Sequence, residues 1–249
     1  MPVAIAAAFG AVVGSFLNVV AYRLPRKESL VKPRSRCPGC GAAVKPYDNV
    51  PVVGWLVLRG RCRACGASIS PRYPVIEVLT AALAVTVVLV EHSAHDIALG
   101  LVLIVVLIPI ALIDLEHRII PNKILLPAAI AAVTIGWASK PSAVPEQLIA
   151  AAAAGGFLLL FAVMYPRGMG MGDVKLAAVL GLFLGREVGV AVLVGVFAAT
   201  CVGVLIMTRA GVSEGRKTAV PLGPFLAFGA VAALFAGPAI IHWYSHSLV

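Results

Sequence analysis

The chain is built around eight apolar segments, and this pattern restricts its fold more than any other feature. A membrane-spanning helix needs about 20 predominantly apolar residues, because the bilayer offers its backbone no hydrogen-bond partners. Hydrophobic residues make up 61% of the 249-residue chain and charged residues only 12%, too little polar surface for a water-soluble globule of this size. We therefore expect an all-α polytopic membrane protein with about eight transmembrane helices. The segments are residues 2–22, 74–90, 97–114, 124–138, 147–165, 175–184, 188–207 and 221–244.

The segment 175–184 is the shortest of the eight, and the placement of the charges supports counting it as a helix. With the N-terminus outside and eight alternating helices, 18 of the 20 Lys and Arg residues fall on the cytoplasmic side, and only Lys140 and Arg186 fall outside. Such a bias fixes the orientation by the positive-inside rule. Without the short helix, the basic residues within 209–217 would lie on the wrong side.

The net charge of +9 does not indicate nucleic-acid binding, because the basic residues are distributed as topology and lipid headgroups require. We therefore expect the lipid bilayer as a partner and no nucleic acid. The first apolar segment lacks a basic n-region and a clear cleavage site, so we interpret it as a retained span and not as a signal peptide.

One long polar insertion, residues 23–73, lies between the first two apolar segments and carries 11 of the 20 basic residues. The sequence thus predicts a first transmembrane helix at 1–22, a small cytoplasmic domain at 23–73 and a membrane core at 74–249. Four of the five cysteines stand in the insertion as two Cys-x-x-Cys pairs with 21 residues between the pairs. These are Cys37, Cys40, Cys62 and Cys65.

Two Cys-x-x-Cys pairs at this separation can supply four thiolates to a tetrahedral zinc ion. Two disulfides are the alternative, which the predicted cytosolic position of the loop disfavours because the cytosol is reducing. Four cysteine ligands leave no open position for a catalytic water, so we expect a structural zinc that supplies folding energy to a loop with little core of its own. Cys201, alone in an apolar segment, is interpreted as a packing residue.

Two aspartates, Asp114 and Asp173, lie at the edge of apolar segments, where an ionised side chain is costly and indicates function by default. The predicted topology brings both to the cytoplasmic face at a similar depth. Two adjacent carboxylates can share one proton, so that one accepts a proton from water while the other donates to a carbonyl oxygen. The glycines Gly168, Gly170 and Gly172 before Asp173 would allow close approach of an extended substrate.

Each aspartate also has a simpler explanation. An Asp173 that only capped the N-terminus of a helix would have the same sequence around it. An Asp114 that only marked the boundary between membrane and water would also have the same sequence around it. His117, one turn from Asp114, is interpreted as an interfacial side chain, and the four other histidines fall on the opposite face. We predict no catalytic role for any of the five.

Other classes of protein also place acids in membranes. Secondary transporters use them near the bilayer midplane between repeated halves, whereas this sequence places both aspartates at one face and shows no internal repeat. A transporter or proton-coupled carrier is therefore the alternative function, and a zinc-stabilised scaffold without chemistry is a third. A presenilin-like protease shares the Gly-x-Gly-Asp element but not the cysteine loop.

Ordered blocks from Gly10 to about Gly229 resemble the type IV prepilin peptidases, bacterial inner-membrane aspartyl proteases of the GxGD class. The blocks are Gly14-Ser15-Phe16-Leu17-Asn18, Tyr22-Arg23-Leu24-Pro25, the paired cysteines with Asp48-Asn49-Val50-Pro51 between them, Arg72-Tyr73-Pro74, Glu77, Asp114 with Pro121, Gly170-Met171-Gly172-Asp173-Val174-Lys175 and Pro221-Leu222-Gly223-Pro224-Phe225. The chain departs from the family pattern at Asn122, where relatives often carry Asp, and at Leu222, where Phe is common.

The resemblance implies removal of a basic leader from prepilins or pseudopilins, after a glycine, on the cytoplasmic side of the inner membrane. Carried over, Asp114 and Asp173 are the catalytic pair, and Gly170, Gly172 and Lys175 are candidates for substrate contact and backbone clearance. Members with the cysteine loop also methylate the new amino terminus with S-adenosylmethionine, so a bifunctional enzyme is expected, with the location of the cofactor site unknown.

A leader rich in Lys and Arg would stay in the cytosol while the neighbouring apolar helix lies in the bilayer, so the junction would lie at the depth of the two aspartates. Glu28, Asp48 and Glu77 are candidates for meeting the positive charge of the leader, although the loop as a whole is basic.

Overall fold

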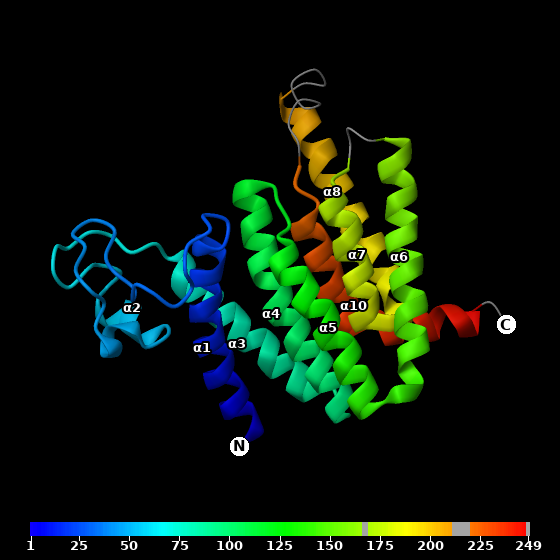
Figure 1. The fold of residues 1–249 in the computed structure, drawn as a ribbon, viewed down its shortest axis with the longest axis horizontal. Helices are drawn as coiled ribbons and strands as arrows, with labels where there is room; N and C mark the ends of the chain where they lie inside the picture. The colour runs from blue at the N-terminus through cyan, green and yellow to red at the C-terminus, as the bar shows by residue number, and fades with distance from the viewer. Residues whose placement is uncertain (166–168, 211–219, 248–249) are drawn as a thin grey trace. The chain divides into compact units, whose positions relative to one another are not determined.

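The protein is nearly all helical. The computed structural model describes residues 1–165, 169–210 and 220–247, which contain two isolated β-bridges and no β-strand. The α-helices (Figure 1) are α1 (Pro2–Arg23), α2 (Val53–Val57), α3 (Arg72–Val90), α4 (Ala94–His117), α5 (Asn122–Ser139), α6 (Val144–Met164), α7 (Met171–Leu184), α8 (Val188–Ala210) and α10 (Gly223–Ser247). Three short 3-10 helices accompany them: η1 (Pro46–Asn49), η2 (Pro141–Ala143) and η3 (Gly185–Glu187).

Packing divides the chain into two compact units, Met1–His92 and Ser93–Val249. The first unit contains α1, α3 and the loop with α2 between them, and the second contains α4 to α10. The division into three domains at residues 22 and 73 stays a prediction.

In the first unit, α1 and α3 pack closely because α1 presents glycine to its partner. A Cβ added at Gly14 would lie 2.9 Å from the Cα of Glu77, and one at Gly10 would lie 2.8 Å from the backbone of α3. Small residues four apart allow such close approach of membrane helices, which associate by van der Waals packing. One turn after Gly14, the buried Asn18 amide donates to the carbonyl oxygens of Gly14 (3.2 Å) and Tyr73 (3.4 Å).

In the second unit, α4 supplies much of the core, and α6 pairs with α7 while α8 pairs with α10. Close helix contact again depends on glycine: a Cβ at Gly181 of α7 would lie 2.6 Å from the Cα of Ala151 on α6. The side chains at the centre are almost fully inaccessible, which fixes the relative positions of the helices that carry the aspartates. They include Leu103, Ile110, Leu176, Leu180 and Leu226.

The chain reverses direction between α7 and α8. Gly185, with a φ of +55°, begins the short η3 at this turn, and α8 then runs back antiparallel to α10 (Figure 1). Gly195 of α8 contacts Leu226 near the start of α10, while Glu187 lies against Gly237 nearer its end. The short segment predicted at 175–184 is therefore a helix of its own, α7, extended at its N-terminus to Met171.

Seven stretches of the described residues are long and apolar enough to cross a bilayer, and one of them, Met171–Arg209, contains both α7 and α8. Counted as separate helices, α1, α3 to α8 and α10 correspond to the eight predicted segments. The prediction of an all-α polytopic membrane protein is confirmed.

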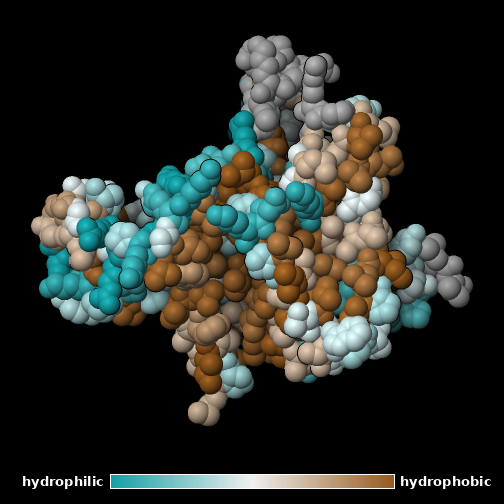
Figure 2. All heavy atoms as spheres, in the orientation of Figure 1, coloured by the Kyte–Doolittle hydropathy of each residue, from teal (hydrophilic) through white to brown (hydrophobic). Residues whose placement is uncertain are grey.

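On the face shown in Figure 2, hydrophobic side chains cover the sides of the helices, whereas hydrophilic residues gather on the loop of the first unit and at one end of the helices of the second unit. Phe9, Val163, Leu193 and Phe197 are each more than 60% exposed. Such a surface is stable only against lipid, as expected for a multi-pass membrane protein.

Candidate active site

Asp114 lies in the last turn of α4, and Arg118 caps the C-terminus of this helix. The Arg118 residue adopts a left-handed backbone with a φ of +54°, and its N–H donates to the Asp114 carbonyl oxygen at 2.9 Å. Asp114 is only 5% exposed, although it lies one turn from the end of the helix. A carboxylate buried to this degree needs a hydrogen-bond donor.

That donor comes from the first residue of α10. The backbone N–H of Gly223 donates to Asp114 Oδ2 at 2.9 Å, in a buried contact between residues 109 positions apart in sequence. The first N–H groups of a helix lack partners within the helix, and the helix dipole favours negative charge there. Asp114 therefore caps α10 from outside the helix. A Cβ at Gly223 would lie 2.6 Å from the same oxygen, so this position has room only for glycine.

Asp173 lies in the first turn of α7, which begins directly after Gly170. A Cβ at Gly170 would lie 3.3 Å from Asp173 Oδ2, and one at Gly172 would lie 3.0 Å from Cβ of Ile120. The two glycines thus keep the surroundings of Asp173 free of side chains and allow α7 to approach the connection between α4 and α5. Gly168, the first glycine of the run, lies outside the described residues.

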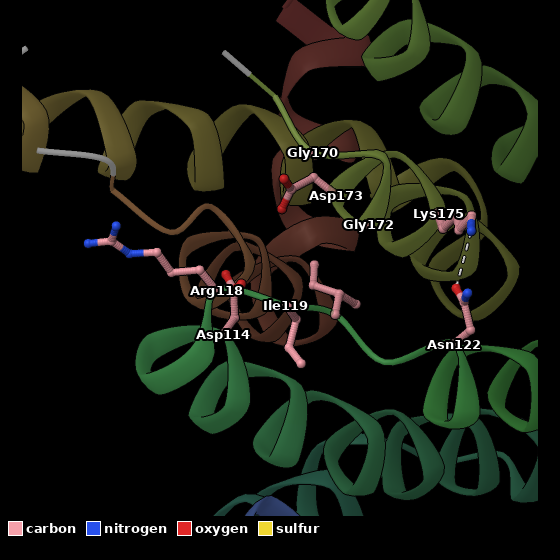
Figure 3. A pocket seen from close by; sticks show the side chains of 9 residues that line it. Asp114, Arg118, Ile119, Asn122, Gly170, Gly172, Asp173 and Lys175 are labelled. Atoms are coloured by element: carbon pink, nitrogen blue, oxygen red, sulfur yellow. Dashed lines mark hydrogen bonds between the residues drawn. The ribbon is translucent and has the colours of Figure 1, made fainter. Parts of the chain in front are cut away.

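The two aspartates line the same cavity, and their carboxyl groups point toward one another (Figure 3). The cavity has a volume of about 310 Å³. Its lining comes from the end of α4, the connection to α5 and the start of α7. The complete lining is Asp114, Arg118, Ile119, Ile120, Asn122, Gly170, Gly172, Asp173 and Lys175.

Lys175 and Asn122 form a polar contact within this lining. Lys175 Nζ donates to Asn122 Oδ1 at 3.2 Å, and this hydrogen bond joins α7 to the first residue of α5 (Figure 3). The guanidinium of Arg118 extends away from the two carboxyl groups. The structure therefore brings together the candidate residues Asp114, Asp173, Gly170, Gly172 and Lys175, all within the second unit.

This arrangement has the parts needed for acid and base catalysis on one bound water. Two carboxyl groups that interact can hold one proton between them, so that one acts as base and the other as acid. Both also lie at helix N-termini, Asp114 at α10 and Asp173 at α7, where negative charge is stabilised.

The four cysteines of the first unit form a second candidate site. Their sulfur atoms all lie within 4.8 Å of one another. The two pairs have the same backbone geometry: Cys37 N–H donates to Ala42 O at 2.9 Å, and Cys62 N–H donates to Ala67 O at 2.8 Å. A glycine with positive φ follows the second cysteine of each pair, at Gly41 (φ +70°) and Gly66 (φ +72°).

Four sulfur atoms this close together could serve as ligands of one metal ion. Backbone N–H groups, that of Cys65 foremost and then that of Ala64, lower the pKa of the Cys62 thiol to about 7. In Cys65 the backbone N–H of Ala67 lowers the pKa of the thiol, but the hydrogen bonds with the other cysteine sulfurs, that of Cys40 foremost, outweigh it and raise this pKa to about 11. A metal ion binds thiolates, so its binding would release protons from this cluster. Backbone hydrogen bonds close the turn at each cysteine pair, so the backbone positions the sulfur atoms near one another. The cluster can hold a metal ion, as the sequence predicts.

Comparison with known proteins decides the family. Residues 8–90 match the bacterial peptidase A24 N-terminal domain, and residues 101–208 match the type IV leader peptidase family. Over 269 residues, the chain is 32% identical to the prepilin leader peptidase/N-methyltransferase of Aeromonas hydrophila, which covers 95% of this chain and 91% of that protein. The chain belongs to the type IV leader peptidase family.

Other relatives agree. The prepilin leader peptidase/N-methyltransferase of Legionella pneumophila is 34% identical over 265 residues, covering 95% of this chain and 92% of that protein. That of Myxococcus xanthus is 38% identical over 182 residues, covering 70% of this chain and 54% of that protein. No solved structure matches the chain. The resemblance to type IV prepilin peptidases is confirmed, and none of these relatives supports the transporter alternative.

The three acids that we suggested for contact with a basic leader all lie in the first unit of this leader peptidase. Asp48 accepts hydrogen bonds from Arg63 at 2.6 to 3.2 Å, and this guanidinium holds the pKa of Asp48 below its usual range. Glu77 accepts the Val52 N–H at 2.7 Å. Both carboxylates thus have partners within the unit, while Glu28 is exposed.

The histidines have local roles in the structure. His117 Nε2 lies 3.8 Å from Oε2 of its neighbour Glu116. His95, near the start of α4, has its Nδ1 2.7 Å from Oγ of Ser139, the last residue of α5. None of the five histidines lines the cavity. The prediction that they take no part in catalysis remains a prediction.

The sequence did not assign a role to Gly223 in this leader peptidase. The Pro-Leu-Gly-Pro block was visible in the sequence, but a backbone amide that contacts a distant carboxylate leaves no signal in side-chain chemistry. Arg118, Ile119 and Ile120 were also not predicted to line the cavity with the aspartates.

Proposed function

We propose that the chain is a membrane aspartyl endopeptidase that removes the basic leader from type IV prepilins or pseudopilins, with Asp114 and Asp173 as the catalytic pair. The observation that carries this proposal is the cavity lined by both carboxyl groups, within a family of leader peptidases. One carboxylate takes a proton from the attacking water, and the other donates a proton to the scissile carbonyl oxygen. The Gly223 amide stabilises negative charge on Asp114 at each stage in which that carboxyl group is ionised.

The substrate backbone approaches along the glycines before Asp173. Gly170 and Gly172 leave the carboxylate accessible, and a peptide with glycine at the cleavage point needs little volume in a cavity of about 310 Å³. Lys175, held by Asn122, lies within this lining and is a candidate for hydrogen bonding to the substrate backbone. Where relatives often carry Asp, Asn122 gives the lysine a neutral hydrogen-bond partner.

The orientation of this enzyme follows from the charges. The proposed topology places the N-terminus outside and the active site at the cytoplasmic face of the bacterial inner membrane, because 18 of the 20 Lys and Arg residues then lie on the cytoplasmic side. A basic leader would be retained on that face while the apolar helix of the prepilin enters the bilayer.

We further propose that the enzyme methylates the new amino terminus and that the cysteine cluster holds zinc. Full-length relatives are named prepilin leader peptidase/N-methyltransferase, and the match to the A24 N-terminal domain spans the cysteine loop. S-adenosylmethionine would supply the methyl group when bound. Zinc is favoured over other metals by four thiolate ligands in a closed tetrahedral set, and its role would be structural.

One assay tests both activities. Purified enzyme is incubated with a full-length prepilin and S-adenosylmethionine, and the mass and N-terminal sequence of the product are measured. We expect a product that has lost its leader at a glycine and gained the mass of one methyl group. Mature length without the methyl group would remove the second activity, and an intact prepilin would contradict the peptidase.

Substitution of Gly223 by alanine is expected to lower leader cleavage by about 100-fold, since the added Cβ displaces the Asp114 carboxylate from its position. Gly156→Ala is the matched control, because a Cβ at this glycine of α6 meets nothing within 4 Å. Cleavage rates of both variants are measured with one prepilin. Equal rates in the two variants would show that the contact between Gly223 and Asp114 is unimportant for the reaction.

A further inference from the structure

The loop of the first unit is rich in basic residues, yet it contains one apolar segment. Residues 50–58 carry no charge, although the loop around them holds 11 of the 20 basic residues of the chain. Within this segment, Val53 is 55% exposed, Leu56 60% and Val57 68%. These three residues belong to α2 and are called here the α2 face.

The other side of α2 is fixed to the loop. Gly54 is buried against the backbone of Asp48, where a Cβ would clash. The indole N–H of Trp55 donates to Ile69 O at 3.1 Å, and the ring of Trp55 packs over Gly60. The α2 face is therefore held outward by a helix that cannot turn to bury it.

A hydrogen bond fixes the height of α2 relative to the membrane-spanning helix α3. The Val52 N–H, directly before α2, donates to Glu77 Oε2 at 2.7 Å. Glu77 is 6% exposed and lies five residues after the start of α3, which corresponds to about 8 Å along the helix. Val52 is a β-branched residue with a φ of +61°, a strained conformation that this contact helps to hold.

Measured along the axis of α3, α2 therefore lies beside this helix and not beyond its end. In Figure 1, α2 lies at a level between the two ends of α1, which belongs to the same unit. The polar headgroup layer and the outer part of the acyl chains occupy this level around a spanning helix.

The charges next to the α2 face select the kind of partner. Arg59 and Arg61 follow the helix directly and are both exposed. Arginines beside an apolar surface favour anionic lipid headgroups, whereas they would repel the basic leader of a prepilin. Lipid therefore fits the surface better than the substrate does.

We propose that α2 is an interfacial anchor, with Val53, Leu56 and Val57 inserted at the boundary of headgroups and acyl chains and with Arg59 and Arg61 on anionic headgroups. Contact with an anionic bilayer then holds the four-cysteine site at the membrane surface, independent of which reaction the enzyme catalyses. A helix of five residues would not bind lipid alone, but Glu77 and the loop contacts hold it in place beforehand.

Depth-dependent fluorescence quenching tests the anchor. The double substitution Trp137→Phe and Trp243→Phe leaves Trp55 as the only tryptophan of the full-length chain. This protein is placed in nanodiscs that contain phosphatidylglycerol and phospholipid brominated either near the headgroup or deep in the acyl chain. We expect Trp55 emission to fall with the shallow bromines and to fall less with the deep ones. Emission that neither lipid quenches would overturn the proposal.

Paired variants assign the effect to the α2 face. In the single-tryptophan chain, Leu56→Glu with Val57→Glu should remove most of the shallow quenching, whereas Val31→Glu, at a 78% exposed valine of the same loop, should leave it unchanged. Metal content measured on each variant shows that the loop remains folded. Equal quenching in both variants would contradict the anchor, as would quenching that is lost when a prepilin is added and takes the place of the lipid.

Discussion

Replacement of Asp114 or Asp173 by asparagine is expected to lower the rate of leader cleavage by about a thousandfold or more. Each substitution leaves the size of the side chain unchanged but removes one of the two groups that exchange protons with water and the scissile carbonyl. The double variant should be little worse than either single variant, because the two carboxyl groups act as one unit. Rates are measured under single-turnover conditions with a full-length prepilin.

Asp96→Asn provides a matched control in the same helix. Asp96 lies in the first turn of α4, where its carboxylate contacts Ser93, and it does not line the cavity. This variant should cleave at the normal rate. A purified Asp114→Asn protein that still cuts the prepilin at that rate would rule out the proposed catalytic pair. Slow amide hydrogen exchange in α4 and α7 would show that an inactive variant had not simply unfolded.

The sequence predicted the helices well because a bilayer imposes a simple rule. An apolar stretch must be helical when no water can satisfy its backbone, so composition alone was enough to place α1, α3, α4, α5, α6, α8 and α10. The short α7 needed a second argument, the count of positive charges on each side. Its length became clear only in the structure, where the helix also includes the residues around Asp173.

The sequence also predicted a catalytic pair and a metal site, because an acid at a membrane edge is costly without a function and paired cysteines are typical metal ligands. The catalytic role of the aspartates stays a prediction. The structure brings the two aspartates into one cavity and the four sulfurs within 4.8 Å of one another. The sequence could not predict which groups donate hydrogen bonds to the buried acids. Gly223 contributes only a backbone N–H to Asp114, and Val52 only an N–H to Glu77. Both contacts depend on the packing of distant segments, which leaves no periodicity and no motif in the sequence.

The division into two units has a functional consequence. Both aspartates and Gly223 belong to Ser93–Val249, whereas the cysteines belong to Met1–His92. Changes in the metal site should therefore affect the two proposed activities unequally.

Removal of the metal is expected to unfold the cysteine loop and abolish methylation, with a much smaller effect on cleavage. The loop has little core of its own: of its large apolar side chains, Val31, Val53, Leu56 and Val57 are all more than 50% exposed. A structural zinc ion contributes about 10–16 kcal/mol to the folding of small domains near neutral pH, more than such a loop could replace by packing. Chelated enzyme should therefore show rapid amide hydrogen exchange throughout residues 37–68 and slow exchange in α4 and α7.

Two cysteine substitutions separate metal binding from the general effects of losing a thiol. Cys37→Ser removes a ligand that is 9% exposed within the cluster, and Cys201→Ser removes the cysteine of α8, which lies outside the cluster. We expect the first variant to purify without zinc and to release the leader without methylating the product, and the second to retain both activities. If Cys37→Ser methylated as fast as the unmodified enzyme, the loop would not need its metal. If the rate of leader cleavage by Cys37→Ser fell as far as that of the aspartate variants, the peptidase would depend on the first unit. The two proposed activities could then not be assigned to separate parts of the chain.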